Sequence, residues 1–272
     1  MSYFQIYEYN DNLYQIKDSL GVLSTLIIGK NKACVIDTCY GICNLFDEIR
    51  KITDKELVVI NTHGHMDHAS GNFQFEEVYI HEKDLELIKK HTNASMRQKN
   101  IASAKRTNVL PENFDEEKYI QRREGNLKFV KYHDVFDLGD ITCEVLPLAG
   151  HTKGSIAIYV KEWKLVVSSD GACPFVYMFF NESTTVEEYI ESLENLLKYD
   201  FNEFLVGHGQ KKLLPKSRME EFLKIAKEID LEKSIKVNAS DEGIETYCYA
   251  NVPLYDQNGA GVVFTPTKLK NN

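Results

Sequence analysis

The sequence predicts a layered α/β fold in which two β-sheets are faced by helices. Three observations support this prediction. Short apolar runs near the N-terminus alternate as strands do, amphipathic stretches of helical period follow them, and a second set of strands and helices repeats a similar order further along the chain. With 272 residues, 43% of them hydrophobic, the chain can bury a sizeable core and needs no disulfide or metal merely to fold.

The first 60 residues are expected to form one half of this fold. The amphipathic stretch 44–52 predicts a helix, and it is followed by the apolar run 57–60, which predicts a strand. Four shorter alternating or apolar runs precede the helix and predict strands at 4–9, 13–16, 22–28 and 33–36.

The second set predicts the other half. Helices are expected at 186–199 and 216–228, where apolar residues recur with helical spacing. Strands are expected at 135–138, 141–146, 155–160, 164–168 and 203–206.

The segment between the two sets is expected to be a helical, basic insert at about 82–125 within a single domain spanning 1–272. From Lys83 to Lys131 there are twelve Lys and Arg residues and seven Asp and Glu residues, so this region is positive in a chain of net charge −9. Two interpretations stay open: a solvated outer face, or a lid over the active site that attracts an anionic substrate.

Composition also bears on partners and compartment. The acidic balance argues against non-specific nucleic-acid binding. The six cysteines lack Cys-x-x-Cys spacing, and the N-terminus has no basic region followed by an apolar stretch, so a reduced, cytoplasmic protein is expected. No apolar run approaches the roughly 20 residues that span a bilayer, so no membrane partner is expected.

Three of the eight histidines fall within the motif Thr62-His63-Gly64-His65-Met66-Asp67-His68, directly after the predicted strand 57–60. Imidazole and carboxylate groups are the ligands that borderline divalent metals prefer. In an extended loop His63 and His65 share one face, and a distant third histidine would complete a three-nitrogen site. His151, in a Gly-containing turn, is the best candidate for this third ligand.

A second metal is expected beside the first. Asp67 and His68 would bind it together with His208, which has glycine on both sides, and Asp170 could bridge two metals about 3.5–4 Å apart. Taken singly, His151, His208 and Asp170 suit a structural role as well as a ligand role, but all three follow predicted strands. Of the other histidines, His81 is expected at a strand end, and His91 and His133 are expected to be exposed.

The motif at 62–68, together with Gly150-His151-Thr152, Ser169-Asp170-Gly171 and Gly207-His208-Gly209, resembles the metallo-β-lactamase superfamily. The resemblance implies an αβ/βα four-layer sandwich of two mixed β-sheets flanked by helices. It also implies a binuclear zinc centre, with His63, His65 and His151 on one ion, Asp67, His68 and His208 on the other, and Asp170 bridging. The seven-ligand set is closer to the glyoxalase II and lactonase branches than to true β-lactamases.

Three further residues are candidates for supporting roles. Asp37 matches the strand-end aspartate of the family; it would either orient a metal ligand or cap the turn at 38–41. Phe175 and Tyr177 lie in the apolar stretch 173–180 after Asp170, which we interpret as a loop that either packs in the core or forms an aromatic wall for a substrate.

The predicted function is therefore a binuclear metallo-hydrolase that uses a metal-bridging hydroxide on a small, anionic ester, thioester or lactone. Asp67 would also accept the proton of the attacking water. Two Zn²⁺ per chain are expected, with iron or manganese as alternatives. The competing hypothesis is a phosphodiesterase or nuclease on the same centre, suggested by the basic insert.

Overall fold

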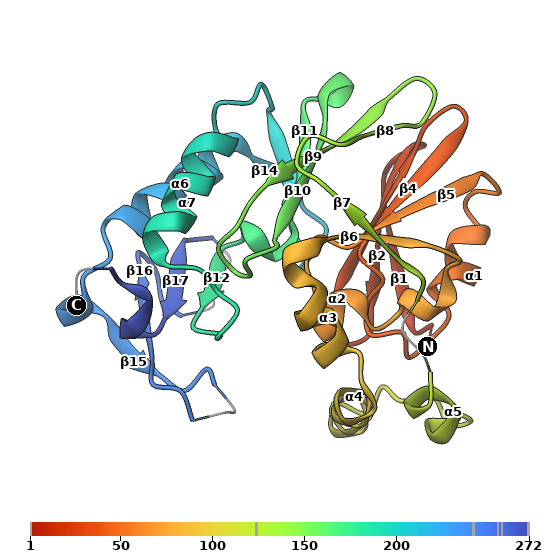
Figure 1. Cartoon of the computed structure of the whole chain (residues 1–272), viewed down its shortest axis with the longest axis horizontal. Coiled ribbons are helices and arrows are strands. Elements are labelled where there is room, and N and C mark those ends of the chain that lie inside the picture. The colour runs from red at the N-terminus through yellow and green to blue at the C-terminus, as the bar shows by residue number, and fades with distance from the viewer. Residues whose placement is uncertain (1, 123–124, 241–242, 255, 257, 271–272) are drawn as a thin grey trace. The chain divides into compact units, whose positions relative to one another are not determined.

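The computed structural model describes residues 2–122, 125–240, 243–254, 256 and 258–270. The chain divides into two compact units (Figure 1). The first comprises Met1–Glu144 and His208–Lys211, and the second comprises Val145–Gly207 and Lys212–Asn272. A single domain spanning 1–272 stays a prediction.

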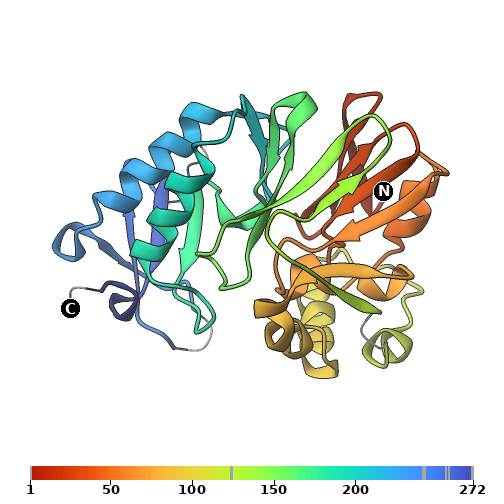
Figure 2. The same cartoon turned by 45° about the horizontal axis from the view of Figure 1, so that its top comes forward.

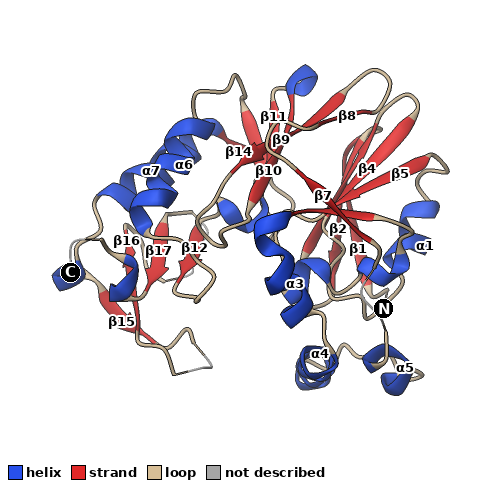
Figure 3. Cartoon of the chain, in the orientation of Figure 1, coloured by secondary structure: helices blue, strands red, loops and turns tan. Residues whose placement is uncertain are grey.

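The first unit is built on a seven-stranded mixed sheet, whose strands are red in Figure 3. Strand order follows chain order: the first four strands form an antiparallel meander, and the last three join it in parallel. The strands are β1 (Phe4–Asn10), β2 (Leu13–Asp18), β3 (Leu23–Ile28), β4 (Lys32–Ile36), β5 (Glu56–Ile60), β6 (Val78–His81) and β7 (Leu127–Val130). The strands predicted in this region are confirmed.

The centre of this sheet is buried, which explains its apolar runs. All six residues of β3 are buried, as expected for a strand covered on both faces. The predicted helix forms as α1 (Leu45–Arg50), and its Leu45 and Ile49 pack into the cluster that also contains Val35 and Val59. Asn44 begins α1 because its side chain accepts a hydrogen bond from the Asp47 backbone N–H.

The predicted insert is helical over its described part. It contains the 3₁₀ turn η2 (Glu82–Asp84) and the helices α3 (Leu85–His91), α4 (Ala94–Arg106) and α5 (Glu116–Ile120). The segment that leads into it contains α2 (Met66–Ala69) and the 3₁₀ turn η1 (Asn72–Gln74). Arg123 and Glu124, which belong to the predicted insert, lie outside the described residues.

The second unit contains two further sheets. The chain enters it within β9 (Thr142–Pro147), whose first residues pair with β8 (Val135–Asp137) in the first unit. One sheet has the strand order β14-β13-β11-β10-β9 and the other β12-β17-β16-β15. The strands are β10 (Ile156–Val160), β11 (Leu165–Val167), β12 (Phe175–Met178), β13 (Glu203–Leu205), β14 (Leu214–Pro215), β15 (Ile235–Val237), β16 (Thr246–Ala250) and β17 (Gly261–Phe264).

Two amphipathic helices lie side by side in this unit, α6 (Val186–Leu196) and α7 (Lys216–Lys227) (Figures 1 and 2). Their buried residues, such as Tyr189 and Phe222, pack with the sheet residues Phe204 and Phe264 in one apolar cluster. Thr185 begins α6 with a reciprocal capping box to Glu188. Short 3₁₀ turns η3 (Lys161–Trp163), η4 (Ser169–Gly171), η5 (Leu231–Lys233) and η6 (Pro266–Lys268) complete the unit.

Two sequence expectations were wrong. The stretch after Asp170 is not simply a loop, because Phe175–Met178 forms β12 and pairs in parallel with β17. His91 is half-buried rather than exposed, because its ring stacks on that of His65, with ring centroids 5.0 Å apart. The expectations for His81, which ends β6, and for exposed His133 are confirmed.

Candidate metal centre

The histidine motif of the first unit is held where β5 ends. Asp37, just after β4, accepts hydrogen bonds from the backbone N–H of Thr62 (2.8 Å) and from its hydroxyl (2.8 and 3.0 Å). Asp84 accepts from the backbone N–H of Gly64 (2.9 Å). A Cβ at Gly64 would lie only 3.0 Å from the backbone nitrogen of Ile88, so this close approach to α3 favours glycine. Two buried carboxylates therefore fix the loop from both sides.

Asp37 also sets the tautomer of two histidines. Its carboxylate lies 2.9 Å from His68 Nδ1, which donates its proton and leaves the Nε2 lone pair available. The Thr62 hydroxyl donates to Asp37, so its oxygen can accept from His63 Nδ1 at 3.1 Å. His63 Nε2 is then also left with a lone pair.

His208 belongs to the first unit although it follows the second unit's β13 in the chain. It forms an isolated antiparallel bridge with Val22, beside β3. Two residues later, Gln210 accepts a hydrogen bond from the Tyr7 hydroxyl of β1 (3.2 Å). Gly209 between them has φ +112°, a backbone conformation that favours glycine. The sheet therefore fixes the position of His208.

Three potential ligand atoms converge in this unit. His68 Nε2 lies 3.2 Å from His208 Nε2, and Asp67 Oδ2 lies 3.5 Å from His68 Nε2 and 3.4 Å from His208 Nε2. Ligands on a tetrahedral zinc ion with bonds of about 2.0–2.1 Å would be about 3.3–3.4 Å apart. The spacing and chemistry of these donors fit a bound metal ion.

The protonation of Asp67 agrees with this arrangement. Burial raises the pKa of its carboxyl, but the neighbouring imidazoles of His68 and His208 outweigh burial and hold the pKa well below its usual range. The carboxylate is therefore ionised, as a metal ligand must be.

His63 and His65 form the other part of the cluster. Their ligand-type nitrogens lie within 4.8 Å of each other, and their ring centroids are 4.8 Å apart. The His63 ring also lies 4.3 Å from that of His68. Five predicted ligands of the first unit, His63, His65, Asp67, His68 and His208, are thus brought together.

His151, in the second unit, is oriented in a similar way by a different group. Its Nδ1 lies 2.8 Å from the backbone carbonyl of Tyr177, which accepts the proton and leaves Nε2 as the possible ligand. The Ser183 hydroxyl donates to the His151 carbonyl (2.8 Å). Gly150 lies against α6, where a Cβ would be 2.4 Å from the Tyr189 ring.

Asp170 lies beside His151 in the second unit. It sits in η4 at the end of β11, after Ser169, whose φ is +48°. The distance from Asp170 Oδ2 to His151 Nε2 is 3.9 Å. A Cβ at Gly171 would lie 2.6 Å from Leu148, so the turn that carries Asp170 is packed against the core. Both predicted ligands of this unit are therefore neighbours.

The two aromatic residues predicted to support the site, Phe175 and Tyr177, differ in burial. Phe175 is buried with Phe179 and Val263 in a small apolar cluster, so it packs in the core. Tyr177 is half-buried, and its contribution to His151 comes from its backbone. Sequence reasoning missed this carbonyl and the stacking of His91 on His65. The presence of His91 in the predicted helical insert was the one available signal for the stacking.

Comparisons with known proteins identify the class. A family model described as the metallo-beta-lactamase superfamily matches residues 18–208, and the chain belongs to this superfamily. Every predicted metal ligand lies within the matched range.

Among curated proteins the chain is similar to acyl-coenzyme A thioesterase MBLAC2. The Homo sapiens protein is 24% identical over 189 residues, which cover 64% of this chain and 66% of that protein. The Gallus gallus protein is 24% identical over 186 residues, which cover 64% and 65%. The chain thus spans slightly less than two thirds of the length of these relatives.

Solved structures share the fold. DIM-1 metallo-beta-lactamase matches with a TM-score of 0.60 at 13% identity, over 83% of this chain and 98% of that chain. A metallo-beta-lactamase family protein from Thermus thermophilus matches with a TM-score of 0.56 at 19% identity, over 80% of each chain. These matches confirm the predicted fold class.

Proposed function

We propose that the protein is a binuclear zinc hydrolase of small acyl thioesters. The observation that carries the proposal is the convergence of Asp67, His68 and His208 at the spacing of a tetrahedral metal site. The similarity to acyl-coenzyme A thioesterases favours a thioester among the ester, thioester and lactone substrates that the sequence suggested.

The full ligand assignment remains a proposal from the motifs. His63, His65 and His151 would bind one ion, Asp67, His68 and His208 the other, and Asp170 would bridge them. Zinc ions held in this way would supply a nucleophile at neutral pH and would polarise the thioester carbonyl. Iron and manganese are the alternative ions, because imidazole and carboxylate groups bind them as well.

The residues themselves have distinct roles in the hydrolysis. Asp37 holds His68 Nδ1–H, so that Nε2 stays available as a ligand. The Asp67 carboxylate would accept the proton of the attacking water as this water adds to the thioester carbonyl, before the carbon–sulfur bond breaks. The products would be a carboxylic acid and a free thiol, with the water proton passing to the leaving sulfur.

The state of the cysteine thiols indicates the cellular compartment of the protein. All six cysteines, Cys34, Cys39, Cys43, Cys143, Cys173 and Cys248, are free. Free thiols suit a reducing environment, and we infer a cytoplasmic location. In the part of the chain that the structure describes, no helix is long and apolar enough to cross a membrane.

A phosphodiesterase remains the second candidate because many basic side chains of the insert, including Lys90, Lys99 and Arg106, are exposed. Arg97 is an exception with a structural role. It is 1% exposed, and its guanidinium donates to the Ser70 carbonyl (3.1 Å) and lies over the rings of Phe73 and Tyr119.

The experiment measures metal content and two activities on the same samples. We expect close to two metal ions per chain by elemental analysis, thiol release from acyl-coenzyme A, and little hydrolysis of bis-p-nitrophenyl phosphate. Asp170→Ala should lower metal content and thiol release together, whereas the exposed control Asp54→Ala should keep both. Phosphodiester cleavage with steep salt dependence would favour the second candidate. One metal or none, without hydrolysis of either substrate, would contradict both.

A further inference from the structure

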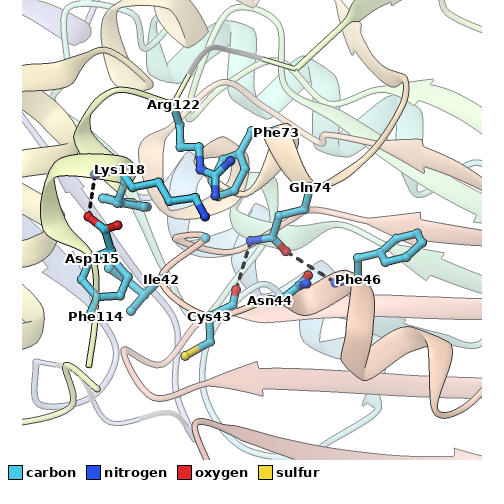
Figure 4. Close-up of a pocket in the computed structure, with 12 residues that line it drawn as sticks. Ile42, Cys43, Asn44, Phe46, Phe73, Gln74, Phe114, Asp115, Lys118 and Arg122 are labelled. Atoms are coloured by element: carbon cyan, nitrogen blue, oxygen red, sulfur yellow. Dashed lines mark hydrogen bonds between the residues drawn. The ribbon is translucent and has the colours of Figure 1, made fainter. Parts of the chain in front are cut away.

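A pocket of about 340 Å³ lies in the first unit, between α5 and the loop that leads into α1 (Figure 4). Its volume is in the range of small-molecule sites in proteins. None of the predicted metal ligands lines it. Its lining combines basic side chains with aromatic ones.

Two cations enter this pocket, Lys118 from α5 and Arg122 from the segment just after this helix. Both side chains extend toward the middle of the pocket in Figure 4. Neither forms an ion pair with a carboxylate among the described residues. Asp115 is the acidic residue of the lining, and its carboxylate caps α5 by accepting from the Lys118 backbone N–H (2.9 Å). The lining therefore has a net positive charge that suits an anion.

Aromatic rings form much of the remaining wall. Phe46, Phe73, Phe114 and Tyr119 all line the pocket. The Arg122 guanidinium lies 4.8 Å from the centroid of the Phe73 ring, an arrangement that holds this cation at the wall. Flat apolar surfaces beside two cations suit a ligand with a planar aromatic body and an anionic group.

The walls are held in place before any ligand binds. Gln74 accepts a hydrogen bond from the Leu45 backbone N–H (2.7 Å) and donates to the Cys43 carbonyl (3.0 Å), so it fixes the loop. Tyr119, which is 3% exposed, donates its hydroxyl proton to the Tyr40 carbonyl (2.6 Å) and fastens α5 to the same loop. A fixed pocket lowers the ordering cost of binding.

The structure points to a second binding site, separate from the metal ligands, that takes a small aromatic phosphate of mononucleotide size. Lys118 and Arg122 would contact the phosphate, and the phenylalanine rings would contact the aromatic body. This inference does not rest on the proposed thioesterase activity, and the site would bind its ligand whatever reaction the enzyme catalyses.

The probe is adenosine 5′-monophosphate, titrated calorimetrically into the metal-loaded protein, with adenosine and inorganic phosphate as controls. We expect one molecule bound per chain, and at least tenfold weaker binding of both controls. Arg122→Gln should raise the Kd at least tenfold, and Lys118→Gln about three- to tenfold. Lys99→Gln, which replaces an exposed lysine on α4, should leave the Kd unchanged.

Several results would overturn the inference. Binding that is equally tight in Lys118→Gln and Arg122→Gln would place the nucleotide elsewhere, the metal ligands included. Phosphate that binds as tightly as the nucleotide would remove the aromatic contribution, and adenosine that does so would remove the anionic one. No binding at millimolar nucleotide would exclude the site. Because both replaced side chains are exposed, matching thermal unfolding temperatures would verify that the variants are folded.

Discussion

His68 in the first unit and His151 in the second have the same chemical requirement and meet it differently. As proposed metal ligands, both need an acceptor for the Nδ1 proton so that Nε2 is available to an ion. For His68 the acceptor is the Asp37 carboxylate at 2.9 Å. For His151 it is the backbone carbonyl of Tyr177 at 2.8 Å. A single side-chain substitution can therefore remove the first acceptor but not the second.

This difference teaches where each region is vulnerable. The carboxylate of Asp37 holds the ring of His68 and the backbone of Thr62 in place, so the first region depends on one charged group. The carbonyl of Tyr177 is positioned by β12, which pairs with β17. The second region therefore depends on correct strand pairing and on the packing around Gly150.

The largest expected effect is on stability and comes from the close packing around one glycine in each region. A Cβ at Gly71 would lie 2.0 Å from the backbone oxygen of Thr38, whereas a Cβ at Gly150 would lie 2.4 Å from the Tyr189 ring. Backbone moves less readily than a side chain, so Gly71→Ala should lower the free energy of unfolding by more than about 3 kcal/mol and Gly150→Ala by about 1–3 kcal/mol. Urea denaturation at neutral pH measures both. Equal losses would mean that Tyr189 cannot adjust.

Asp18, another buried aspartate of the first unit, differs from Asp37 in the groups that it contacts. Asp18 is 2% exposed, and its Oδ1 accepts from the backbone N–H groups of Leu20 and Val22 (both 3.0 Å). Burial raises its pKa to about 6 from an ordinary 3.8, against the lowering effect of backbone donors. Above pH 6 the folded protein must hold a buried charge that the unfolded chain solvates freely.

The raised pKa fixes the sign of the pH dependence. The contribution of Asp18 to stability is fully present below pH 3.8 and is lost as pH rises through about 6, which amounts to about 3 kcal/mol. Asp18→Asn should therefore be about 2–3 kcal/mol more stable than the wild type at pH 8 and show no such advantage at pH 4. Urea denaturation across this range measures the difference, and Asp54→Asn, at an exposed position, is the control. A difference that does not change with pH would contradict the expectation.

Removing the carboxylate acceptor should weaken metal binding directly. Asp37→Asn replaces the charged partner of His68 by an amide, and we expect metal affinity to fall about 10- to 100-fold. Tyr177→Phe should change affinity less than about twofold, because His151 contacts the backbone carbonyl rather than the hydroxyl. Competition with a chelator measures both variants, and Asp11→Asn serves as an exposed control. A larger loss in Tyr177→Phe than in Asp37→Asn would reverse the comparison.

The same contrast explains what could be predicted from the sequence. The strands and helices flanking the motifs, and the clustering of His63, His65, Asp67 and His68, follow from local pattern because these residues are close in the chain. Asp37 was visible as a carboxylate after a strand. The backbone carbonyl of Tyr177 has no sequence signal, because every residue has one, and only the pairing of β12 with β17 places it beside His151.

Long-range placement was the other limit. The proximity of His208 to His68 depends on the bridge between His208 and Val22. These two residues are 186 positions apart in the chain, so no local sequence pattern predicts that they pair. The strand β12 was interpreted as a loop because its apolar run is short and follows the turn that carries Asp170. His91 was expected to be exposed because no cluster of ligand-type residues lies near it in the sequence, and its stacking on the ring of His65 could not be predicted from helical pattern.

The smallest expected effect concerns His91, whose ring stacks on that of His65 at an interplanar angle of 30°. We expect His91 to support His65 by packing alone. His91→Phe should then keep metal affinity within about twofold of the wild type. His91→Ala should lower the affinity about three- to fivefold, because it leaves a gap beside the His65 ring. Chelator competition on both variants measures this. Equal losses of metal affinity in the two variants would instead show that a ring nitrogen of His91 is required. The contribution of His91 would then come from a polar contact of that nitrogen rather than from packing.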